Sequence, residues 1–322
     1  MSKQDVLVLG GLRAETLEGL KQQFTTHLVK DAKELSALLA RIGNGIRGAA
    51  RGTHIGVDRA MMEQLPKLEI VANFGVGYDG IDTKAAAERG IIVTNTPDVL
   101  TEEVADTTLG LLLMTVRDLP AGERYLRAGK WPSGDFPLSK GSMRDRKVGM
   151  IGLGRIGLAI ARRLDAMGVP VSYHTRNPRK DVPYNYYPDL AAMAEAVDTL
   201  IIIVPGTAET KGMVNAKILK ALGPTGIVIN VGRGVVIDEP ALVEALKSHT
   251  IQAAGLDVFP HEPQVSPELL ALDNTVLLPH LGSGSVFTRN AMGQLMIDNL
   301  VSWFRDGKPL TPVVETPWPR KA

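Results

Sequence analysis

The 322-residue chain contains no cysteine at all. This absence excludes disulfide bonds, thiolate nucleophiles and zinc or iron–sulfur sites with cysteine ligands, and it fits a reducing compartment. An excess of one charge is also missing, because 36 basic and 35 acidic side chains leave a formal net charge of +1. With no basic stripe and no acidic tail, nothing favours nucleic acid as a partner.

Long hydrophobic runs are absent as well. No apolar segment approaches the roughly 20 residues that a membrane-spanning helix needs. The first residues, Met1 to Asp5, are polar and lead directly into an apolar run, unlike a secretory signal peptide. We therefore expect a soluble cytoplasmic protein with no membrane partner, and a chain of this length predicts about two domains.

The most informative stretch that is present reads KVGMIGLGRIG and covers residues 147–157. An apolar run leads into Gly152, Gly154 and Gly157, and a segment with apolar residues at helical spacing follows. A strand, a glycine-rich turn and a helix in this order are typical of dinucleotide binding. The glycines allow a tight turn, the approach of a pyrophosphate and close packing of helix on strand. An ordinary tight turn is the alternative. The apolar positions of the helix are Ile156, Ile160, Leu164 and Met167.

Short apolar strands alternate with helices on both sides of this stretch, which predicts two doubly wound parallel sheets. From Thr101 to Met114, a helix that is apolar nearly all round interrupts the alternation and must be buried on several sides. The amphipathic helix near the C-terminus could complete either module. We assign it to the first, because chain termini often lie close together. The expected domains are residues 1–98 plus 287–322, and residues 99–286.

The end of the second strand in the second module bears on the choice of nucleotide. In NAD-selective sites a carboxylate about 20 residues beyond the glycines bonds the ribose hydroxyls. Here His174 lies where the adenosine is expected, and no acid appears before Asp181. Arg176 suits a phosphate dianion and Thr175 adds a polar donor, which points to the 2′-phosphate of NADP(H). Arg179 is a further candidate, and an Arg176 that merely lies in a polar surface loop is the alternative.

Among the six histidines, His280 is the best candidate for an acid–base group. It follows an apolar strand, and ligands of open α/β sheets bind beyond the carboxyl ends of strands. A carboxylate would orient its imidazole, and Glu262, in a loop after another strand, is our candidate. Asp257 also ends a strand and could bond the nicotinamide amide. The other histidines are assigned surface or capping roles, and we identify no partner for His27 or His54.

A candidate anion clamp follows a further strand, where Arg233 stands between Gly232 and Gly234. Flanking glycines would let backbone and guanidinium approach a small ligand closely. A bidentate guanidinium matches a carboxylate. An arginine in a plain solvent turn would not explain glycines on both sides.

These residues together resemble the D-isomer-specific 2-hydroxyacid dehydrogenase family over nearly the whole chain. The motifs that carry the resemblance are GVGYD at 75–79, the glycine triplet, NVGRG at 230–234, GLDVF at 255–259 with Glu262-Pro263, and Pro279-His280. The Thr175-Arg176 pair is similar to that of the NADPH-dependent glyoxylate/hydroxypyruvate reductases in this family. The chain departs from many relatives at 281–284, which affects fine substrate contacts rather than the chemistry, and it also departs at Gly206, where many relatives have leucine.

The resemblance implies a flavodoxin-like substrate-binding domain, a Rossmann cofactor domain and a homodimer. It implies that Arg233 binds the substrate and polarises its carbonyl, that His280 is the acid–base group and also contacts substrate, and that Glu262 orients it. Backbone N–H groups of Val76 and Gly77 would hold the substrate carboxylate. The implied cofactor contacts, beyond the three glycines and the pair Thr175-Arg176, are Thr101, Leu153, Arg155, Ile156, His174, Val204, Pro205, Val231, Gly232, Asp257 and Gly282.

The implied reaction is hydride transfer from NADPH to the carbonyl carbon of a small 2-oxo acid such as glyoxylate or hydroxypyruvate. His280 would protonate the nascent alkoxide while Arg233 stabilises the developing charge, so that no metal is required. A larger 2-oxo acid stays open as the substrate. Phosphoglycerate dehydrogenases, many of which carry a further regulatory domain, and formate dehydrogenases, which carry glutamine in place of Glu262, are less favoured. From another class, the C-terminal-binding-protein corepressors use this fold mainly as a dinucleotide-gated scaffold.

Overall fold

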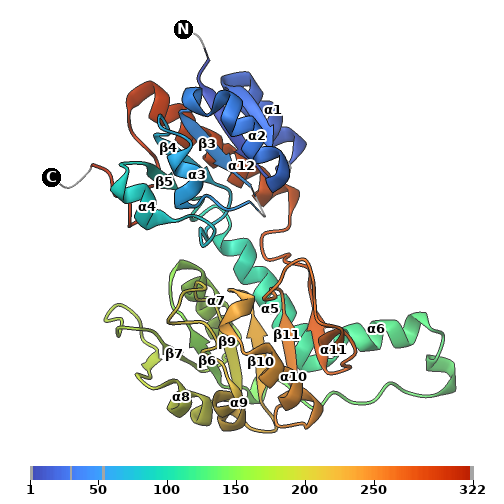
Figure 1. Ribbon diagram of the computed structural model, residues 1–322. Helices are drawn as coiled ribbons and strands as arrows, with labels where there is room; N and C mark the ends of the chain where they lie inside the picture. The colour runs from blue at the N-terminus through green and yellow to red at the C-terminus, as the bar shows by residue number, and fades with distance from the viewer. Residues whose placement is uncertain (1–2, 30, 53–54, 320–322) are drawn as a thin grey trace. The chain divides into compact units, whose positions relative to one another are not determined.

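The computed structural model describes residues 3–29, 31–52 and 55–319. The chain forms two compact units, one of Met1–Leu100 with Ser285–Ala322 and one of Thr101–Gly284 (Figure 1). The domain boundaries expected from the sequence lie two residues from each of these boundaries. Each unit is built on a parallel sheet, so the predicted fold class is confirmed. In the part of the chain that is described, no helix has both the length and the apolarity needed to cross a membrane.

The first unit contains a five-stranded parallel sheet in the order β2-β1-β3-β4-β5, which is the flavodoxin-like order. Its strands are β1 Asp5–Leu9, β2 Thr25–Val29, β3 Gly48–Arg51, β4 Ile70–Asn73 and β5 Ile92–Thr94. Its helices are α1 Ala14–Gln23, α2 Ala32–Ile42, α3 Arg59–Glu63, α4 Thr83–Glu88 and α12 Val286–Asp306. Alternate strand residues enter different cores: Val6 and Val8 pack with α1 and α12, whereas Leu7 and Leu9 pack with α2, α3 and α4.

The C-terminal segment is part of this unit. Helix α12 packs against α1, β3 and β4. It ends at Gly307, which adopts the left-handed φ of +66°. Beyond it the chain returns to the edge strand β5, where the Val313 N–H donates to Val93 O at 2.9 Å. The residues after α12 therefore lie beside β5 and the loop that follows it.

The second unit contains a seven-stranded parallel sheet in the order β12-β11-β10-β9-β6-β7-β8. Its strands are β6 Val148–Ile151, β7 Val171–His174, β8 Asn185–Tyr186, β9 Thr199–Ile202, β10 Ile227–Asn230, β11 Ala253–Leu256 and β12 Thr275–Leu277. The chain runs outward from β6 in one direction and then resumes at β9 in the other. The switch point between β6 and β9 is where open α/β sheets bind their ligands.

Helices cover both faces of the second sheet. The helices of this unit are α5 Thr101–Arg117, α6 Leu119–Arg127, α7 Arg155–Ala166, α8 Leu190–Ala196, α9 Ala216–Leu222, α10 Glu239–Lys247 and α11 Pro267–Leu270, of which all but α6 pack on the sheet. Helices α5 and α7 pack on one face, and α8 to α11 pack on the other. The central strands β6, β9, β10 and β11 are buried on both faces for this reason, which explains why they read as short continuous apolar runs.

Two expectations about helices need correction. Helix α5 is buried against α7 and the strands β10 to β12, but it is not apolar all round. Its residues Glu102 and Asp106 are exposed and pair with Arg163 of α7, at 2.8 and 2.7 Å. In α7, Met167 follows the last helical residue and is exposed rather than buried, because the helix ends one residue before it.

Four short elements were not predicted, namely α3, α6, α11 and β8. None of them has an apolar repeat long enough to give a periodic signal. Helix α6 begins at Leu119, directly after the left-handed Asp118, and no residue of α6 is fully buried. In Figure 1 this helix and the segment after it project from the second unit. Strand β9 ends at Ile202, so that Val204 and Pro205 lie in the loop beyond it.

Candidate active site

The glycine-rich turn leaves the carboxyl end of β6 and leads into α7. Gly152 has a φ of +98°, and a Cβ atom there would lie 2.6 Å from Ile203 O. A Cβ on Gly157 would lie 2.7 Å from Gly152 O. A Cβ on Gly154, by contrast, would meet no atom within 4 Å. The outer two glycines are therefore required by packing, while the middle one borders open space beside the N-terminus of α7, where a phosphate can approach backbone N–H groups.

The loop after β7 carries the residues that we expect near the adenosine. The His174 Nδ1 atom lies 2.9 Å from Tyr187 O, so the ring is tied to backbone. The Thr175 hydroxyl donates to Asn177 O at 2.7 Å. The side chain of Arg176 is exposed. Its positive charge can therefore act on a solvent-accessible anion.

A carboxylate that the sequence reasoning missed lies near Arg176. Glu209 comes from the loop after β9 and has a lowered pKa. The main cause is a hydrogen bond from the Thr207 hydroxyl at 2.6 Å, and the charge of Arg176 contributes further. Only the sheet order, which brings the loops after β7 and β9 to one edge, reveals this neighbour. Glu209 partly neutralises the cation expected to bind a phosphate.

Arg179 lies in the same loop but binds protein groups. Its Nη1 donates to Leu153 O in the glycine-rich turn at 2.6 Å. The rest of the guanidinium pairs with Asp181. The Arg179 N–H also donates to the Tyr173 hydroxyl at 2.8 Å. Arg179 therefore ties this loop to the turn, and its charge is balanced by a neighbouring acid.

The structure brings Glu262 and His280 together. The His280 Nδ1 atom lies 2.7 Å from Glu262 Oε2, and Glu262 Oε1 accepts the Phe259 N–H at 2.9 Å. Burial, the largest influence, opposes ionisation of Glu262. The hydrogen bonds from His280 and Phe259 and the charges of His280 and Arg233 outweigh it, so that the pKa of Glu262 is lowered. The carboxylate is thus ionised and holds the imidazole by Nδ1, which leaves Nε2 as the atom that can face a ligand.

His280 sits in an unusual backbone conformation that Asp257 supports. Its φ is +53°, in the left-handed region that few side chains adopt. The buried Asp257 carboxylate accepts the N–H groups of Leu281 at 2.6 Å and Gly282 at 2.8 Å, and Asp257 O accepts the His280 N–H. Burial raises the pKa of Asp257, and the two backbone hydrogen bonds oppose this rise. Asp257 therefore fixes the segment that carries His280. Its bond to a nicotinamide amide stays a prediction.

Arg233 follows β10, in a turn held by Asn230. The Asn230 side chain accepts the Gly232 N–H at 3.1 Å and donates to Arg233 O at 3.0 Å. A Cβ on Gly232 would lie 2.8 Å from Val204 O, and one on Gly234 would lie 2.0 Å from the Phe259 carbonyl carbon. The flanking glycines are therefore required by packing against neighbouring loops, and the close approach of a ligand stays a prediction. Because the charge of Arg233 acts on Glu262, the arginine belongs to the same electrostatic site.

Most of the remaining candidate residues of this unit lie beyond strand ends, namely Val204 and Pro205 after β9, Val231 and Gly232 after β10, and Gly282 after β12. The exception is Thr101, which is the first residue of helix α5. In the first unit, Val76 and Gly77 follow β4, in a loop to which the side chains of Asn73 and Asn95 donate hydrogen bonds.

The sequence indicated no partner for two further histidines. His27 has a partner that the sequence did not indicate, because its Nε2 lies 2.7 Å from Asp5 Oδ1 across the paired strands β1 and β2. His54 lies outside the described residues.

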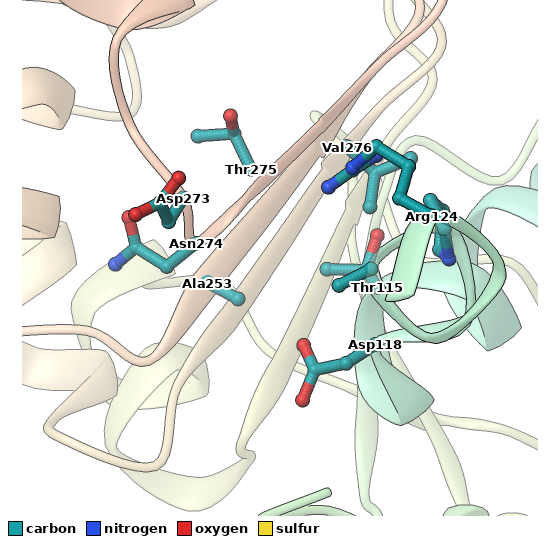
Figure 2. A pocket seen from close by; sticks show the side chains of 10 residues that line it. Thr115, Asp118, Arg124, Ala253, Asp273, Asn274, Thr275 and Val276 are labelled. Carbon is teal, nitrogen blue, oxygen red and sulfur yellow. The ribbon is translucent and has the colours of Figure 1, made fainter. Parts of the chain in front are cut away.

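A pocket in the second unit lies away from these groups (Figure 2). It is lined by Thr115, Asp118, Pro120, Ala121, Arg124, Ala253, Asp273, Asn274, Thr275 and Val276. These residues belong to the end of α5, to α6 and to the amino ends of β11 and β12. Ligands of parallel sheets bind at the carboxyl ends, so this hollow is not the candidate active site.

Comparisons with known proteins agree with the geometry. Residues 109–282 match the model of the D-isomer specific 2-hydroxyacid dehydrogenase, NAD binding domain. The chain is 43% identical over 314 residues to a glyoxylate/hydroxypyruvate reductase A of Arabidopsis thaliana, covering 98% of this chain and 100% of the relative. It is 40% identical to a 2-ketogluconate reductase of Gluconobacter oxydans, covering 97% and 99%.

A crystal structure is similar over the full length. The NADPH-dependent glyoxylate/hydroxypyruvate reductase from Sinorhizobium meliloti, in complex with NADP and malonate, is 55% identical, covers 100% of both chains and superposes with a TM-score of 0.95. The resemblance seen in the sequence motifs is thereby confirmed, and the chain belongs to the D-isomer-specific 2-hydroxyacid dehydrogenase family.

Proposed function

We propose that this protein is an NADPH-dependent reductase of small 2-oxo acids, with glyoxylate and hydroxypyruvate as substrates. The observation that carries the proposal is the 2.7 Å contact between His280 and an ionised Glu262, with the charge of Arg233 acting on the same carboxylate. The printed functions of the relatives from Arabidopsis thaliana and Sinorhizobium meliloti support the substrate and the cofactor.

In this proposal each residue of the trio has one task. Glu262 fixes the ring of His280 through Nδ1, so that Nε2 can face the substrate. The proton at Nε2 passes to the carbonyl oxygen of the substrate as that oxygen becomes an alkoxide. Arg233 holds the substrate and stabilises the negative charge on the same oxygen. Bound NADPH would supply the hydride to the carbonyl carbon, and the product is the 2-hydroxy acid.

The second unit fits the dinucleotide. The open space at Gly154 and the N-terminus of α7 suit the pyrophosphate, with Leu153, Arg155 and Ile156 around it. Thr175 and Arg176 would bind the 2′-phosphate. The other cofactor contacts proposed are those at the strand ends named above, together with Thr101 and His174.

The first unit would bind the substrate carboxylate through the N–H groups of Val76 and Gly77. Backbone donors at a loop after a parallel strand suit a small anion.

Exposed apolar side chains support a homodimer formed through the second unit. They gather on α6 and the segment after it and are Leu119, Leu126, Trp131 and Leu138, which are 50, 58, 61 and 96% exposed. Apolar side chains gathered on one projecting segment mark an interface. Light scattering at micromolar concentration should give about twice the 34.6 kDa chain mass, and a value near 34.6 kDa would exclude the dimer. The absence of cysteine supports a reducing, cytoplasmic compartment.

The deciding experiment is a panel of NADPH-linked reduction rates over glyoxylate, hydroxypyruvate and larger 2-oxo acids. We expect saturable turnover of the two small acids, well above that of the His280→Ala variant. Turnover no greater than that of the variant would instead favour a dinucleotide-gated scaffold.

A further inference from the structure

We infer that Asn73 and Asn95 are positioning residues that orient the two backbone N–H groups of the substrate loop, residues 75–79. The inference rests on the proposed function, because it concerns the Val76 and Gly77 N–H groups assigned there to the substrate carboxylate. Neither asparagine belongs to the sequence motifs, and the proposed function assigns neither of them a role.

Asn73 controls the peptide unit that contains the Val76 N–H. It is the last residue of β4 and is 1% exposed. Its Nδ2 donates to Gly75 O at 3.1 Å and to Gly77 O at 3.0 Å. In a trans peptide unit the C=O and the following N–H point in opposite directions. With Gly75 O drawn toward Asn73, the Val76 N–H is turned away from it.

Asn95 controls the next peptide unit along the loop. It lies just past β5, and its Nδ2 donates to Val76 O at 2.9 Å. By the same geometry, the Gly77 N–H is turned away from Asn95. Successive N–H groups presented by a short loop form a concave site for an anion. Each asparagine therefore fixes one of the two N–H donors of this site: Asn73 fixes that of Val76, and Asn95 fixes that of Gly77.

The loop needs this support because glycine leaves it conformationally free. Gly75 has a φ of +132°, and glycine also occupies position 77. A rotated peptide unit would present a carbonyl oxygen where an N–H is needed, and the oxygen would repel a carboxylate. Thr96 also holds the backbone of Gly75. The Thr96 N–H donates to Gly75 O, and the Gly75 N–H donates to the Thr96 hydroxyl, both at 3.0 Å.

Both asparagines are themselves held in place by hydrogen bonds from residues outside the loop. Asn73 Oδ1 accepts from Arg51 Nη1 at 2.7 Å, which fixes the amide so that its NH₂ group faces the loop. Arg51 in turn donates through Nε to Ile55 O at 2.8 Å. Asn95 is fixed by the C-terminal segment, where the Thr311 hydroxyl donates to Asn95 O at 2.6 Å. Both donor hydrogens of Asn73 are used within the loop, so it acts on substrate through the backbone.

The test replaces each asparagine by alanine in the full-length protein and follows glyoxylate reduction at saturating NADPH. Asn73→Ala and Asn95→Ala should each raise KM about tenfold or more, the scale of one hydrogen bond to a charged group. The kcat should change less than about threefold, because the loop binds the substrate carboxylate equally in the ground state and in the transition state. The Kd of NADPH, from nicotinamide fluorescence, should stay unchanged.

Asn274→Ala is the matched control. Its side chain also donates to two backbone carbonyls, Leu246 O at 3.2 Å and Gln252 O at 3.1 Å, but in the second unit and away from the substrate loop. It should lower the thermal unfolding temperature without raising KM. Circular dichroism checks that each variant is folded, and if Asn73→Ala does not fold, Asn95→Ala decides the question alone.

Competition by oxamate, an unreactive 2-oxo-acid analogue with a carboxylate, gives a readout independent of turnover. Its inhibition constant should rise with KM in both asparagine variants. An active parent enzyme whose KM and oxamate affinity are unchanged in the folded variants would overturn this inference alone. A parent enzyme that reduces no 2-oxo acid would overturn the proposed function and this inference together.

Discussion

The two parallel sheets place different chemistry at the carboxyl ends of their strands. In the first unit the loop after β4 offers neutral backbone donors, and the side chains around it, Asn73 and Asn95, are amides that bond its carbonyl groups. In the second unit the loops after β10, β11 and β12 carry charged side chains, namely Arg233, Glu262 and His280. In the proposed function, one sheet thus recognises the substrate through its backbone and the other through its side chains.

This difference has consequences for mutation. A charged side chain that meets the reacting atoms acts directly, so its loss should appear mainly in kcat. A backbone donor cannot be deleted by substitution, and only the groups that orient it can be changed. Their loss should appear mainly in KM. The two units are therefore distinguished by kcat, which should fall when a charged group of the second unit is changed and stay nearly constant when an amide of the first unit is changed.

His280→Ala should give the largest effect. Removal of one general acid–base group typically costs 10²–10⁴-fold in turnover, and we expect this loss in kcat with little change in NADPH affinity. His27→Ala is the matched control, since His27 also lies 2.7 Å from a carboxylate, Asp5, but in the first unit. A kcat that falls equally in both variants would contradict the assignment.

Arg233→Lys should rank second. Lysine keeps the charge but lacks the planar fork that matches a carboxylate and a carbonyl oxygen together. We expect KM for glyoxylate to rise strongly, by at least about tenfold, and kcat to fall as well, because the charge also stabilises the alkoxide. Steady-state kinetics over a range of glyoxylate concentrations measures both constants. An unchanged KM would remove Arg233 from substrate binding.

Arg176→Ala should reduce the preference for NADPH over NADH, measured as the ratio of kcat/KM values, by about tenfold. The guanidinium is expected to make a charge-assisted hydrogen bond to the 2′-phosphate, which is worth about 1.5–3 kcal/mol. We therefore expect the parent enzyme to prefer NADPH at least tenfold in kcat/KM, less at high salt. The variant should lose most of this preference while its NADH kinetics stay almost unchanged. Equal efficiencies with both cofactors in the parent enzyme would contradict the assignment.

Arg179→Ala provides the contrast to that variant. Arg179 bonds Leu153 O and Asp181, so its loss should loosen the glycine-rich turn and weaken NADPH and NADH alike. Glu209→Gln should strengthen NADPH binding, because it removes an acid that acts on Arg176.

The sequence predicted the elements whose signal is local. Buried strands appear as short apolar runs, and the glycine-rich turn has a motif of its own. Glu262 and His280 could be paired because each follows a strand end and carries a reactive group. The positions of these residues were predictable from their own neighbours in the chain.

Contacts set by the sheet order could not be predicted in this way. Asn73 and Asn95 bond one loop only because β4 and β5 are adjacent, and Glu209 meets the charge of Arg176 only across two loops. The packing role of the glycines beside Arg233 was missed for the same reason, since the groups that crowd them come from the loops after β9 and β11. Asp257 was assigned to the cofactor, and its two bonds to Leu281 and Gly282 depend on the pairing of β11 with β12.

Glu262→Gln tests the role of the Glu262 carboxylate beside His280 through the pH dependence of the reduction rate. The pKa of Glu262 is lowered, so ionised Glu262 stabilises the folded protein at neutral pH, and this contribution is lost only as pH falls through the lowered value. Glutamine keeps the shape but removes the carboxylate that titrates. In the parent enzyme the reduction rate should fall as pH drops through the lowered pKa of Glu262, and this fall should be missing in the variant. An acid-side pH profile that is unchanged in the variant would show that Glu262 does not orient the histidine.

Tyr78→Phe should have the smallest effect, and it sharpens the contrast between backbone and side-chain recognition. The Tyr78 hydroxyl donates to Glu315 at 3.1 Å. Burial, with the charge and the hydrogen bond of Glu315, raises the pKa of Tyr78 to about 12, so the phenol stays protonated through the working range. Because Asn73 and Asn95 orient the loop, loss of this exposed contact should change KM less than about twofold. A rise in KM equal to that of Asn95→Ala would instead show that the C-terminal segment also sets the loop.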